Sequence, residues 1–392
     1  MGIKQVCMIA YTNYLTDVRV RREAETLARN LGYEITVLAL RDGNTASTYI
    51  RDGVEVVELN ISKYRGKNKL KYVMSYLQFL FLSFAKCNKL FFLKKFDIFH
   101  VHNMPDLLVF AAIIPRTLKK KVILDIHDSL PETYAAKYDD AENRFLFKLL
   151  CWEEALCCKF ASKIICVNHV QRDALIKRRI PAEKIIVSMN VPDHKKFSSI
   201  HTKQSKNKSS NTFKLVYHGT ITKRLGVDFA IRAVAKSFDK IPGLEFHIFG
   251  DGDDVEEFIQ LSKLLGIDNI VKFNKMLLLE DLINIVSGMD LGVISNRKNM
   301  ATDLMLPVKM LEYIFLEIPV VAPRLKTIEH YFTEDMISYF EPENVDSLAD
   351  TILKLWSNET ERKEKAMKAK GFLDIYGWEK QQMDLIDFYK EI

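Results

Sequence analysis

Residues 306–323, LPVKMLEYIFLEIPVVAP, decide the fold, because they join a helix pattern to a buried strand pattern. Pro307 suits the first turn of a helix, and residues 318–321 are typical of a buried parallel strand. Such a helix begins beside the carboxyl ends of the strands, where open α/β sheets bind ligands. Glu312 lies within two turns of that point, so its carboxylate can accept hydrogen bonds from both hydroxyls of a ribose. A solvated helix glutamate is the alternative for this residue alone.

Strand and amphipathic helix patterns alternate along all 392 residues, as they do in parallel sheets built from βαβ units. Strands are predicted at residues 6–10, 35–39, 54–59, 98–101, 122–126, 164–167, 185–188, 215–218, 245–249, 271–273, 291–294 and 320–322. The polar stretch 194–211, rich in Lys and Ser, predicts a linker. The sequence therefore predicts a first domain over 1–193, a second over 212–374, and a final helix over 375–392 that crosses back to the first domain.

Composition favours a soluble protein in a reducing compartment. The net charge of +6 is too weakly basic to indicate a nucleic-acid partner by itself. The six cysteines show neither a disulfide-framework spacing nor a C-x-x-C pair, so reduced thiols and a cytoplasmic location are expected. A strand pattern begins at residue 5, which leaves no room for a signal peptide.

The segment 73–85 is the most apolar part of the chain, but it is shorter than the about 20 residues that span a bilayer. Basic residues flank it on both sides: Lys63, Arg65, Lys67, Lys69, Lys71, Lys86, Lys89, Lys94 and Lys95. A basic helix rich in phenylalanine can lie in a membrane interface. Residues 63–96 therefore indicate peripheral contact with the inner face of a cell membrane. An ordinary core helix whose lysines extend to solvent is the alternative.

The second half opens with YHGTITKRLGVDFAIRAV, a pattern of strand, short loop and helix start. The N–H groups at a helix start, with a macrodipole of about half a charge, attract anions. Gly219 allows the backbone to approach a phosphate, and Lys223 or Arg224 can add a charge-assisted contact. Gly250 marks a second tight turn at the same edge of the sheet. Together with the carboxylate described above, these strand ends predict a nucleotide pocket.

Five stretches, in this order, resemble the retaining glycosyltransferases of family four. DVRVRREAETLARNLGYEITVLAL resembles the first helix and second strand of that family, and VILDIHDSLPE resembles its strand that ends in His-Asp or His-Glu. IIVSMNVPD resembles the segment before the linker, FHIFGDGDD a loop of the donor domain, and LPVKMLEY the ribose-binding helix. The resemblance covers almost the whole chain. It implies the GT-B architecture, an α/β fold of two Rossmann-like, doubly wound domains that face each other across a cleft.

The resemblance implies a donor site in the second domain. Glu312 matches the second glutamate of the E-x7-E pattern of the family and would hold the ribose. The other residues implied to bind the donor are Gly219, Thr220, Lys223, Arg224, Gly250, Met276, Leu277 and Lys309. Arg224 is also predicted to be catalytic, because it would neutralise the donor pyrophosphate. Leu304 stands where the first glutamate of the pattern belongs, so the donor sugar is not identified.

The resemblance also implies a site in the first domain. His127 matches a histidine that family members place against the donor sugar, and it is predicted to be catalytic. Asp17 is predicted to be catalytic as well. Asp17, Arg19 and Asp128 are predicted to lie on the acceptor side.

His100 and His102 alternate along a predicted strand and point to one face, as a metal-binding pair would. Neither a cysteine nor a carboxylate joins them at ligand spacing in the sequence, so a local structural role is expected. No metal and no other cofactor is predicted, because the chain lacks an Asp-x-Asp dyad at a suitable loop.

The sequence thus predicts transfer of a sugar from a nucleotide diphosphate-sugar to an acceptor hydroxyl with retention, in surface polysaccharide or glycolipid assembly. The predicted partners are this donor and a glycan or lipid-linked acceptor. Two alternatives remain open: a nucleotide-sugar 2-epimerase on the same fold, and a catalytically silent partner subunit that keeps the fold.

Overall fold

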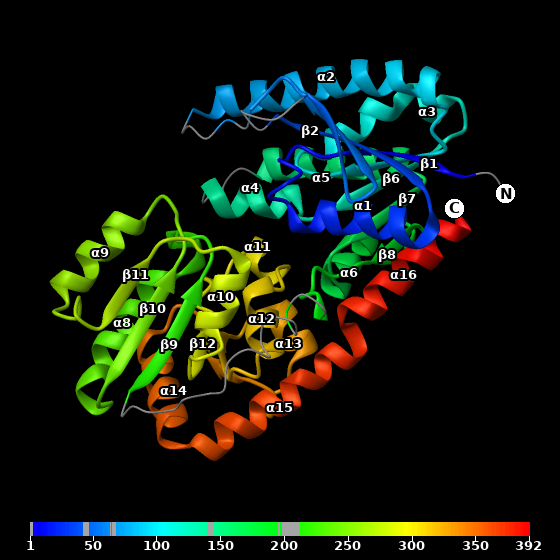
Figure 1. Cartoon of the computed structure of the whole chain (residues 1–392). Coiled ribbons are helices and arrows are strands. Elements are labelled where there is room, and N and C mark those ends of the chain that lie inside the picture. The colour runs from blue at the N-terminus through cyan, green and yellow to red at the C-terminus, as the bar shows by residue number, and fades with distance from the viewer. Residues whose placement is uncertain are drawn as a thin grey trace. The chain divides into compact units, whose positions relative to one another are not determined.

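The computed structural model of the chain describes residues 3–41, 47–62, 64, 68–138, 144–194, 197 and 212–392. Two compact units account for the chain (Figure 1). The first unit combines Met1–Asn190 with Gln381–Ile392, and the second unit is Val191–Lys380. Most of the predicted linker at 194–211 lies outside the described residues.

The described part of the first unit contains an eight-stranded sheet in the order β3-β4-β2-β1-β5-β6-β7-β8. Its strands are β1 (Gln5–Ile9), β2 (Glu34–Leu40), β3 (Thr48–Arg51), β4 (Val54–Leu59), β5 (Ile98–His102), β6 (Lys121–Ile126), β7 (Lys163–Cys166) and β8 (Ile185–Val187). The seven predicted strands are present and pair in parallel. The sequence missed β3, an antiparallel edge strand whose side chains are largely exposed and show no apolar alternation.

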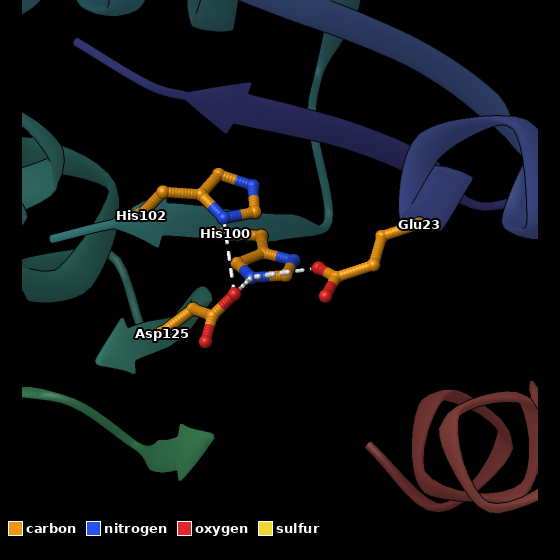
Figure 2. Close-up of side chains that lie close together, drawn as sticks. All are labelled: Glu23, His100, His102 and Asp125. Carbon is orange, nitrogen blue, oxygen red and sulfur yellow. Dashed lines mark hydrogen bonds and ion pairs between the residues drawn. The ribbon is translucent and has the colours of Figure 1, made fainter. Parts of the chain in front are cut away.

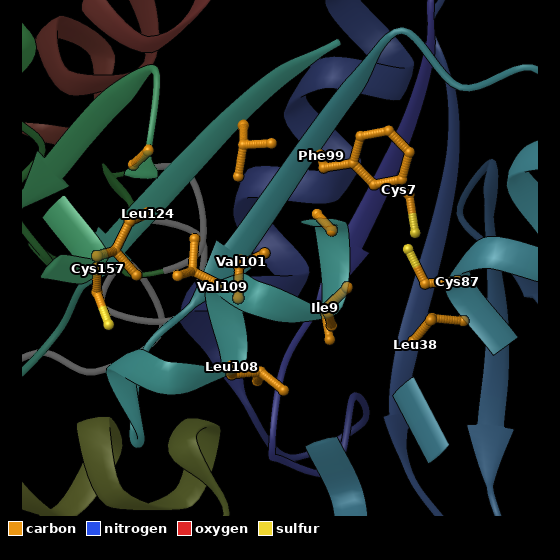
Figure 3. Close-up of a cluster of buried hydrophobic side chains, with 14 of the residues drawn as sticks. Cys7, Ile9, Leu38, Cys87, Phe99, Val101, Leu108, Val109, Leu124 and Cys157 are labelled. Atoms are coloured by element: carbon orange, nitrogen blue, oxygen red, sulfur yellow. The ribbon is translucent and has the colours of Figure 1, made fainter. Parts of the chain in front are cut away.

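Helices cover both faces of this sheet. They are α1 (Val18–Leu31), α2 (Lys69–Lys94), η1 (Asp106–Ala112), α3 (Ile113–Thr117), α4 (Leu130–Tyr138), α5 (Arg144–Phe160), α6 (His169–Lys177), η2 (Ala182–Lys184) and α16 (Trp378–Glu391). On one face, side chains of α2, η1 and α5 pack against Phe99, Val101 and Leu124 of the sheet (Figure 3). On the other face, α1 and the end of α16 pack against the sheet, with Leu27 and Leu385 in the same core.

The predicted first helix is confirmed as α1. Asp17 caps it, because its carboxylate accepts a hydrogen bond from the Val20 N–H at 3.1 Å. Gly32 ends it in the left-handed conformation at φ 64°. Val20, Ala24 and Leu27 lie on one face of this helix and are buried, whereas Leu31 in its last turn is half-buried.

The described part of the second unit contains a parallel six-stranded sheet in the order β11-β10-β9-β12-β13-β14. Its strands are β9 (Phe213–His218), β10 (Leu244–Phe249), β11 (Val271–Asn274), β12 (Leu291–Val293), β13 (Val320–Pro323) and β14 (Ser338–Phe340). The five predicted strands are present. The sequence missed β14, because its three residues, Ser338–Phe340, begin with a serine and do not form a continuous apolar run.

The helices of the second unit are η3 (Lys223–Leu225), α8 (Val227–Ser237), η4 (Phe238–Lys240), α9 (Val255–Leu264), α10 (Leu279–Val286), α11 (Met300–Asp303), α12 (Val308–Phe315), α13 (Lys326–Tyr331), α14 (Val345–Ser357) and α15 (Glu359–Tyr376). The helix predicted after Pro307 is confirmed as α12, with Pro307 as its N-cap residue. Strand order reverses between β9 and β12, which makes the carboxyl edge there the expected ligand position.

The six cysteines, all of which fall in the described part of the chain, are free thiols. None of the helices among the described residues has the length and the apolar character that crossing a bilayer requires.

Candidate functional site

Two glycines bring the loops after β9 and β10 into direct backbone contact. Gly219 donates its N–H to the Phe249 carbonyl at 2.9 Å, and it adopts φ 107°. Gly250 adopts φ 151°, and a Cβ added to it would lie 1.9 Å from the Gly219 carbonyl oxygen. A side chain at Gly250 would therefore separate the two loops.

The rest of the loop after β9 is held in the same way. A Cβ on Gly226 would lie 1.9 Å from the Ser295 carbonyl oxygen, and a Cβ on Gly252 would lie 2.0 Å from the Ile221 carbonyl oxygen. The Arg297 Nε donates to the Lys223 carbonyl at 2.7 Å. The loop is thus packed between its neighbours, as a preformed binding loop needs to be.

Glu312 lies where α12 passes the end of β9. Its Oε2 is 3.1 Å from the Nε2 of His218, the last residue of β9, and its side chain is 18% exposed. The His218 N–H donates to the hydroxyl of Tyr313 at 3.1 Å, which ties the strand end to the helix. The sequence alone does not show that His218 and Glu312 are partners. A carboxylate held in this way remains accessible to a ligand.

Lys309, one turn before Glu312 on α12, carries an enclosed ammonium group. Among the described residues its Nζ has no hydrogen-bond partner, and it lies 3.6 Å from the centre of the Tyr217 ring. A Cβ on Gly219 would be only 3.3 Å from this Nζ. Burial lowers the pKa of Lys309 to about 7, although the nearby Glu312 raises it. A desolvated cation beside a glycine turn suits an anionic ligand.

The other predicted donor residues lie at the same sheet edge but are less strongly held. Arg224 is half-buried in η3, and Thr220 is exposed. Met276 is exposed and Leu277 half-buried in the segment after β11. Lys223 is exposed and forms an ion pair with Glu257 at 2.8 Å, so the structure does not turn its charge toward the glycine loops. The structure therefore brings together Gly219, Gly250, Lys309 and Glu312. The donor roles of all these residues stay predictions.

Asp303, the residue next to Leu304, does not supply the missing first glutamate as a free carboxylate. Its Oδ1 accepts a hydrogen bond from the Lys326 N–H at 3.2 Å, at the start of α13.

The first unit holds a buried polar cluster at the carboxyl ends of β5 and β6. Arg19 donates to Asp125 Oδ1 at 2.6 Å and to Glu23 Oε1 at 3.1 Å. The other oxygen of Asp125, Oδ2, lies 3.0 Å from His102 Nδ1 and 3.0 Å from His127 Nε2. Figure 2 shows the side chains of Glu23, His100, His102 and Asp125 close together.

His100 completes the cluster. Its Nδ1 lies 2.6 Å from the Tyr389 hydroxyl of α16, and its Nε2 lies 3.5 Å from Asp125 Oδ2. Ligand atoms of His100, His102, Asp125 and Glu23 all lie within 4.8 Å of one another. The expectation that no carboxylate joins the two histidines is therefore wrong. The parallel register pairs His102 of β5 with Asp125 of β6, so the two side chains lie on the same face of the sheet.

Burial controls the charges in this cluster. Burial alone would raise the pKa of Asp125, but the charge of Arg19 and the hydrogen bonds from neighbouring histidines outweigh it and hold that pKa well below its ordinary value. Burial and the Asp125 charge raise the pKa of Glu23. Burial and His100 lower the pKa of His102 to about 3. The cluster therefore contains an ionised Asp125 and a neutral His102.

The structure corrects one of the residues expected on the acceptor side. Arg19 lies in the first turn of α1 rather than in a loop, and it is only 6% exposed because its charge is paired inside the unit. Asp17 caps the same helix, and Asp128 is exposed beside His127. The His127 side chain is 23% exposed, so it is the part of the cluster that solvent reaches most readily. The roles of Asp17, Asp128 and His127 stay predictions.

The sequence matches two family profiles that together cover most of the chain. The profile of Glycosyltransferase Family 4 matches residues 17–194, and that of Glycosyl transferases group 1 matches residues 212–358. The chain belongs to this glycosyltransferase family. No match was found among curated protein sequences.

Solved structures resemble this glycosyltransferase over their whole length. Sucrose-phosphate synthase from Thermosynechococcus elongatus has a TM-score of 0.78 at 14% identity, covering 99% of this chain and 98% of the synthase. Anabaena HepE in complex with UDP has a TM-score of 0.72 at 16% identity, covering 100% of both chains. WaaG, a glycosyltransferase involved in lipopolysaccharide biosynthesis, has a TM-score of 0.65 at 16% identity, covering 98% of this chain and 99% of WaaG. At these identities the likeness establishes the fold, and it confirms the predicted GT-B architecture.

We expect Gly250→Ala to destabilise this glycosyltransferase by about 1–3 kcal/mol, because the new Cβ meets the Gly219 carbonyl and alanine is strained at φ 151°. Urea denaturation followed by circular dichroism measures the loss. Gly371→Ala in α15 is the matched control. A Cβ there meets no atom within 4 Å, so it should stabilise the helix by about 0.5–1 kcal/mol. Equal stability of Gly250→Ala and the unmodified protein would show that the loops do not need this contact.

Proposed function

We propose that this chain transfers a sugar from a nucleotide diphosphate-sugar to an acceptor hydroxyl with retention of the anomeric configuration. The observation that carries the proposal is the enclosed Lys309 ammonium, which has no hydrogen-bond partner among the described residues and lies beside Gly219. Lys309 and Glu312 are three residues apart on α12, so they share one face of the helix. One helix face thus offers a cation to a diphosphate and a carboxylate to the hydroxyls of a ribose.

The main chemical task is to stabilise the negative charge that develops on the departing diphosphate. Lys309 supplies one positive charge, and Arg224 is assigned the second because it follows the glycine turn after β9. In an enclosed site such charges act more strongly than they do in water. Because the protein supplies these cations itself, the proposal assigns no metal ion and no other cofactor to the donor site.

The other residues place the substrates. Gly219 and Gly250 allow the backbone to approach the diphosphate, and Met276 and Leu277 are assigned to the base. His127 is assigned to the donor sugar, while Asp17 and Asp128 are assigned to the acceptor side. Anabaena HepE has been solved with UDP-glucose, which makes this compound the first probe to use with the present chain.

We expect Glu312→Ala to raise the Kd for UDP-glucose about 10-fold or more, because hydrogen bonds to a charged group contribute about 1.5–3 kcal/mol. Isothermal titration calorimetry measures the change. Glu364→Ala removes an exposed carboxylate on α15 and should leave the Kd unchanged. If Glu312→Ala binds as tightly as the control, Glu312 does not hold the ribose.

We expect the protein to take up a proton at Lys309 when it binds UDP-glucose above neutral pH. With a pKa of about 7, Lys309 is about nine-tenths neutral at pH 8, and an adjacent diphosphate favours its charged form. Uptake of up to about one proton per complex should be seen at pH 8 and much less at pH 6, where Lys309 is already protonated. Calorimetry in buffers of different ionisation enthalpy measures this uptake.

Lys309→Met keeps the length of the side chain without its charge, and it should abolish the proton uptake as well as weaken binding. A binding enthalpy that is the same in every buffer for the unmodified protein would show that Lys309 does not face the diphosphate.

We also propose that the first unit contacts anionic membrane through α2, where a lipid-linked acceptor would be found. The sequence of α2 contains lysines but neither Asp nor Glu. Large apolar side chains are exposed on it at helical spacing: Leu70, Val73, Met74, Leu77 and Phe81. An open groove of about 1100 Å³ lies beside them and is lined by apolar, neutral polar and basic side chains, the last being Arg41 and Lys71, which suits a lipid with a phosphate head group. Lys63, Arg65 and Lys67 of the predicted basic segment lie outside the described residues.

We expect the double variant Met74→Ser/Phe81→Ser to lower binding to vesicles of mixed neutral and anionic lipid about 10-fold or more, since each apolar side chain contributes about 1.5–3 kcal/mol when buried. Co-sedimentation measures the partitioning. Leu264→Ser is the control, because Leu264 is 84% exposed but lies on α9 of the second unit. Equal sedimentation of the double variant and the control would exclude α2 as the membrane contact.

A further inference from the structure

The Asp125 carboxylate is the centre of the buried cluster in the first unit. Its Oδ1 accepts from Arg19, and its Oδ2 faces nitrogen atoms of the His100, His102 and His127 rings at 3.0–3.5 Å. Figure 2 shows Asp125 with the first two of these rings. Only one of these rings, that of His127, reaches solvent to a useful extent. The buried carboxylate therefore contacts the residue assigned to the donor sugar without being accessible itself.

An ionised carboxylate oxygen only accepts hydrogen bonds, so a nitrogen 3.0 Å away from it must carry a proton or suffer repulsion between lone pairs. Asp125 is ionised for the reasons given above. His127 Nε2 also lies 3.1 Å from His102 Nδ1, but the same rule places a proton on that nitrogen, which lies 3.0 Å from Asp125 Oδ2 and donates to it. His127 Nε2 therefore carries a proton of its own, which it donates to the same carboxylate oxygen.

The remaining contacts of His127 fix the position of its ring. Its backbone N–H donates to Asn103 Oδ1 at 2.9 Å, and its ring packs edge-on against His102 with centroids 5.2 Å apart. Among the described residues, none makes a hydrogen bond to its Nδ1. One edge of the ring is thus held by the cluster, and the other edge is free.

We infer that Asp125, itself oriented by Arg19, is a positioning residue that fixes His127 as the Nε2–H tautomer and presents the lone pair of Nδ1 to the substrate. The inference rests on the proposed function for the identity of that substrate: Nδ1 would accept a hydrogen bond from a sugar hydroxyl. Asp125 does not touch the substrate in this arrangement.

A metal ion is the competing explanation of the cluster. Glu23 Oε2 and His100 Nε2 make no hydrogen bond to a described residue, and the spacing of the four candidate ligands suits a divalent cation. The charges argue against it. Arg19 already balances the ionised Asp125, and Glu23 is held toward its neutral form by burial. A divalent ion would add uncompensated positive charge to a buried site, which is costly.

The first test needs no variant. Two-bond proton–nitrogen spectra of protein labelled with nitrogen-15 in its histidines distinguish a protonated ring nitrogen from one with a lone pair. The expected result is a protonated Nε2 and an unprotonated Nδ1 for His127, assigned by the loss of its signals in His127→Ala. A neutral His127 with the proton on Nδ1 would overturn the inference. So would one equivalent of zinc that stays bound through purification.

The second test reverses the hydrogen bond. In Asp125→Asn the amide oxygen must face Arg19, which only donates, so the amide NH2 faces His127 and favours the Nδ1–H tautomer. The tautomer signal should switch, and kcat should fall about 100-fold or more with a much smaller change in KM. Glu23→Gln is the control, because Glu23 also contacts Arg19 but makes no hydrogen bond to His127. The Glu23→Gln variant should keep His127 as the Nε2–H tautomer.

A double variant separates positioning from general damage. In the His127→Ala background, Asp125→Asn should cause no further loss of kcat, since the residue through which it acts is gone. If Asp125→Asn lowers kcat in the His127→Ala background as much as it does in the unmodified protein, the inference is overturned. The proposed function is tested separately, because absence of donor binding by calorimetry would refute it while the ring tautomer still decides the role of Asp125.

Discussion

The packing of Tyr313 between α12 and the second sheet is the contact on which the donor-side geometry depends. A Cβ on Gly292 in β12 would lie 2.4 Å from the Tyr313 ring, so the ring occupies the space that a side chain would fill. The Tyr313 hydroxyl accepts the His218 N–H, and burial raises the pKa of that hydroxyl well above its usual range. The helix is thus held against both strands at the point where strand order reverses. Lys309 and Glu312 both precede this anchor on the same short helix, so their positions follow from one buried aromatic ring.

Two ways of handling buried charge distinguish the units. In the first unit Arg19 is buried together with both of its partners, Glu23 and Asp125. Without these partners, the free-energy cost of removing the guanidinium from water would be too high for an arginine at this position. In the second unit the Lys309 ammonium is enclosed beside an aromatic ring and makes no hydrogen bond to a described residue. A paired charge orients the residues that it contacts. A buried cation without a hydrogen-bond partner is stabilised when an anion binds to it. The first arrangement serves positioning and the second serves binding.

The sequence predicted most of the fold because buried parallel strands are continuous apolar runs, and twelve such runs became strands. It missed β3 and β14, which lie at sheet edges and lack that pattern. The same reasoning located Glu312, Gly219 and Gly250, because each follows from its place relative to a strand end. Local pattern did not reveal the enclosure of Lys309, which depends on the Tyr217 ring of strand β9.

The polar cluster of the first unit shows where reading one segment at a time fails. Arg19 was expected at the acceptor side because the family resemblance implied that position. Its true partner, Asp125, is 106 residues away, and His102 and Tyr389 come from still other elements. The alternation His100-x-His102 and Asp125-x-His127 was visible, but only the parallel register shows that the two pairs share a face. A carboxylate inside a predicted core strand needs a buried cation or several donors, and the search for that partner would have led to Arg19.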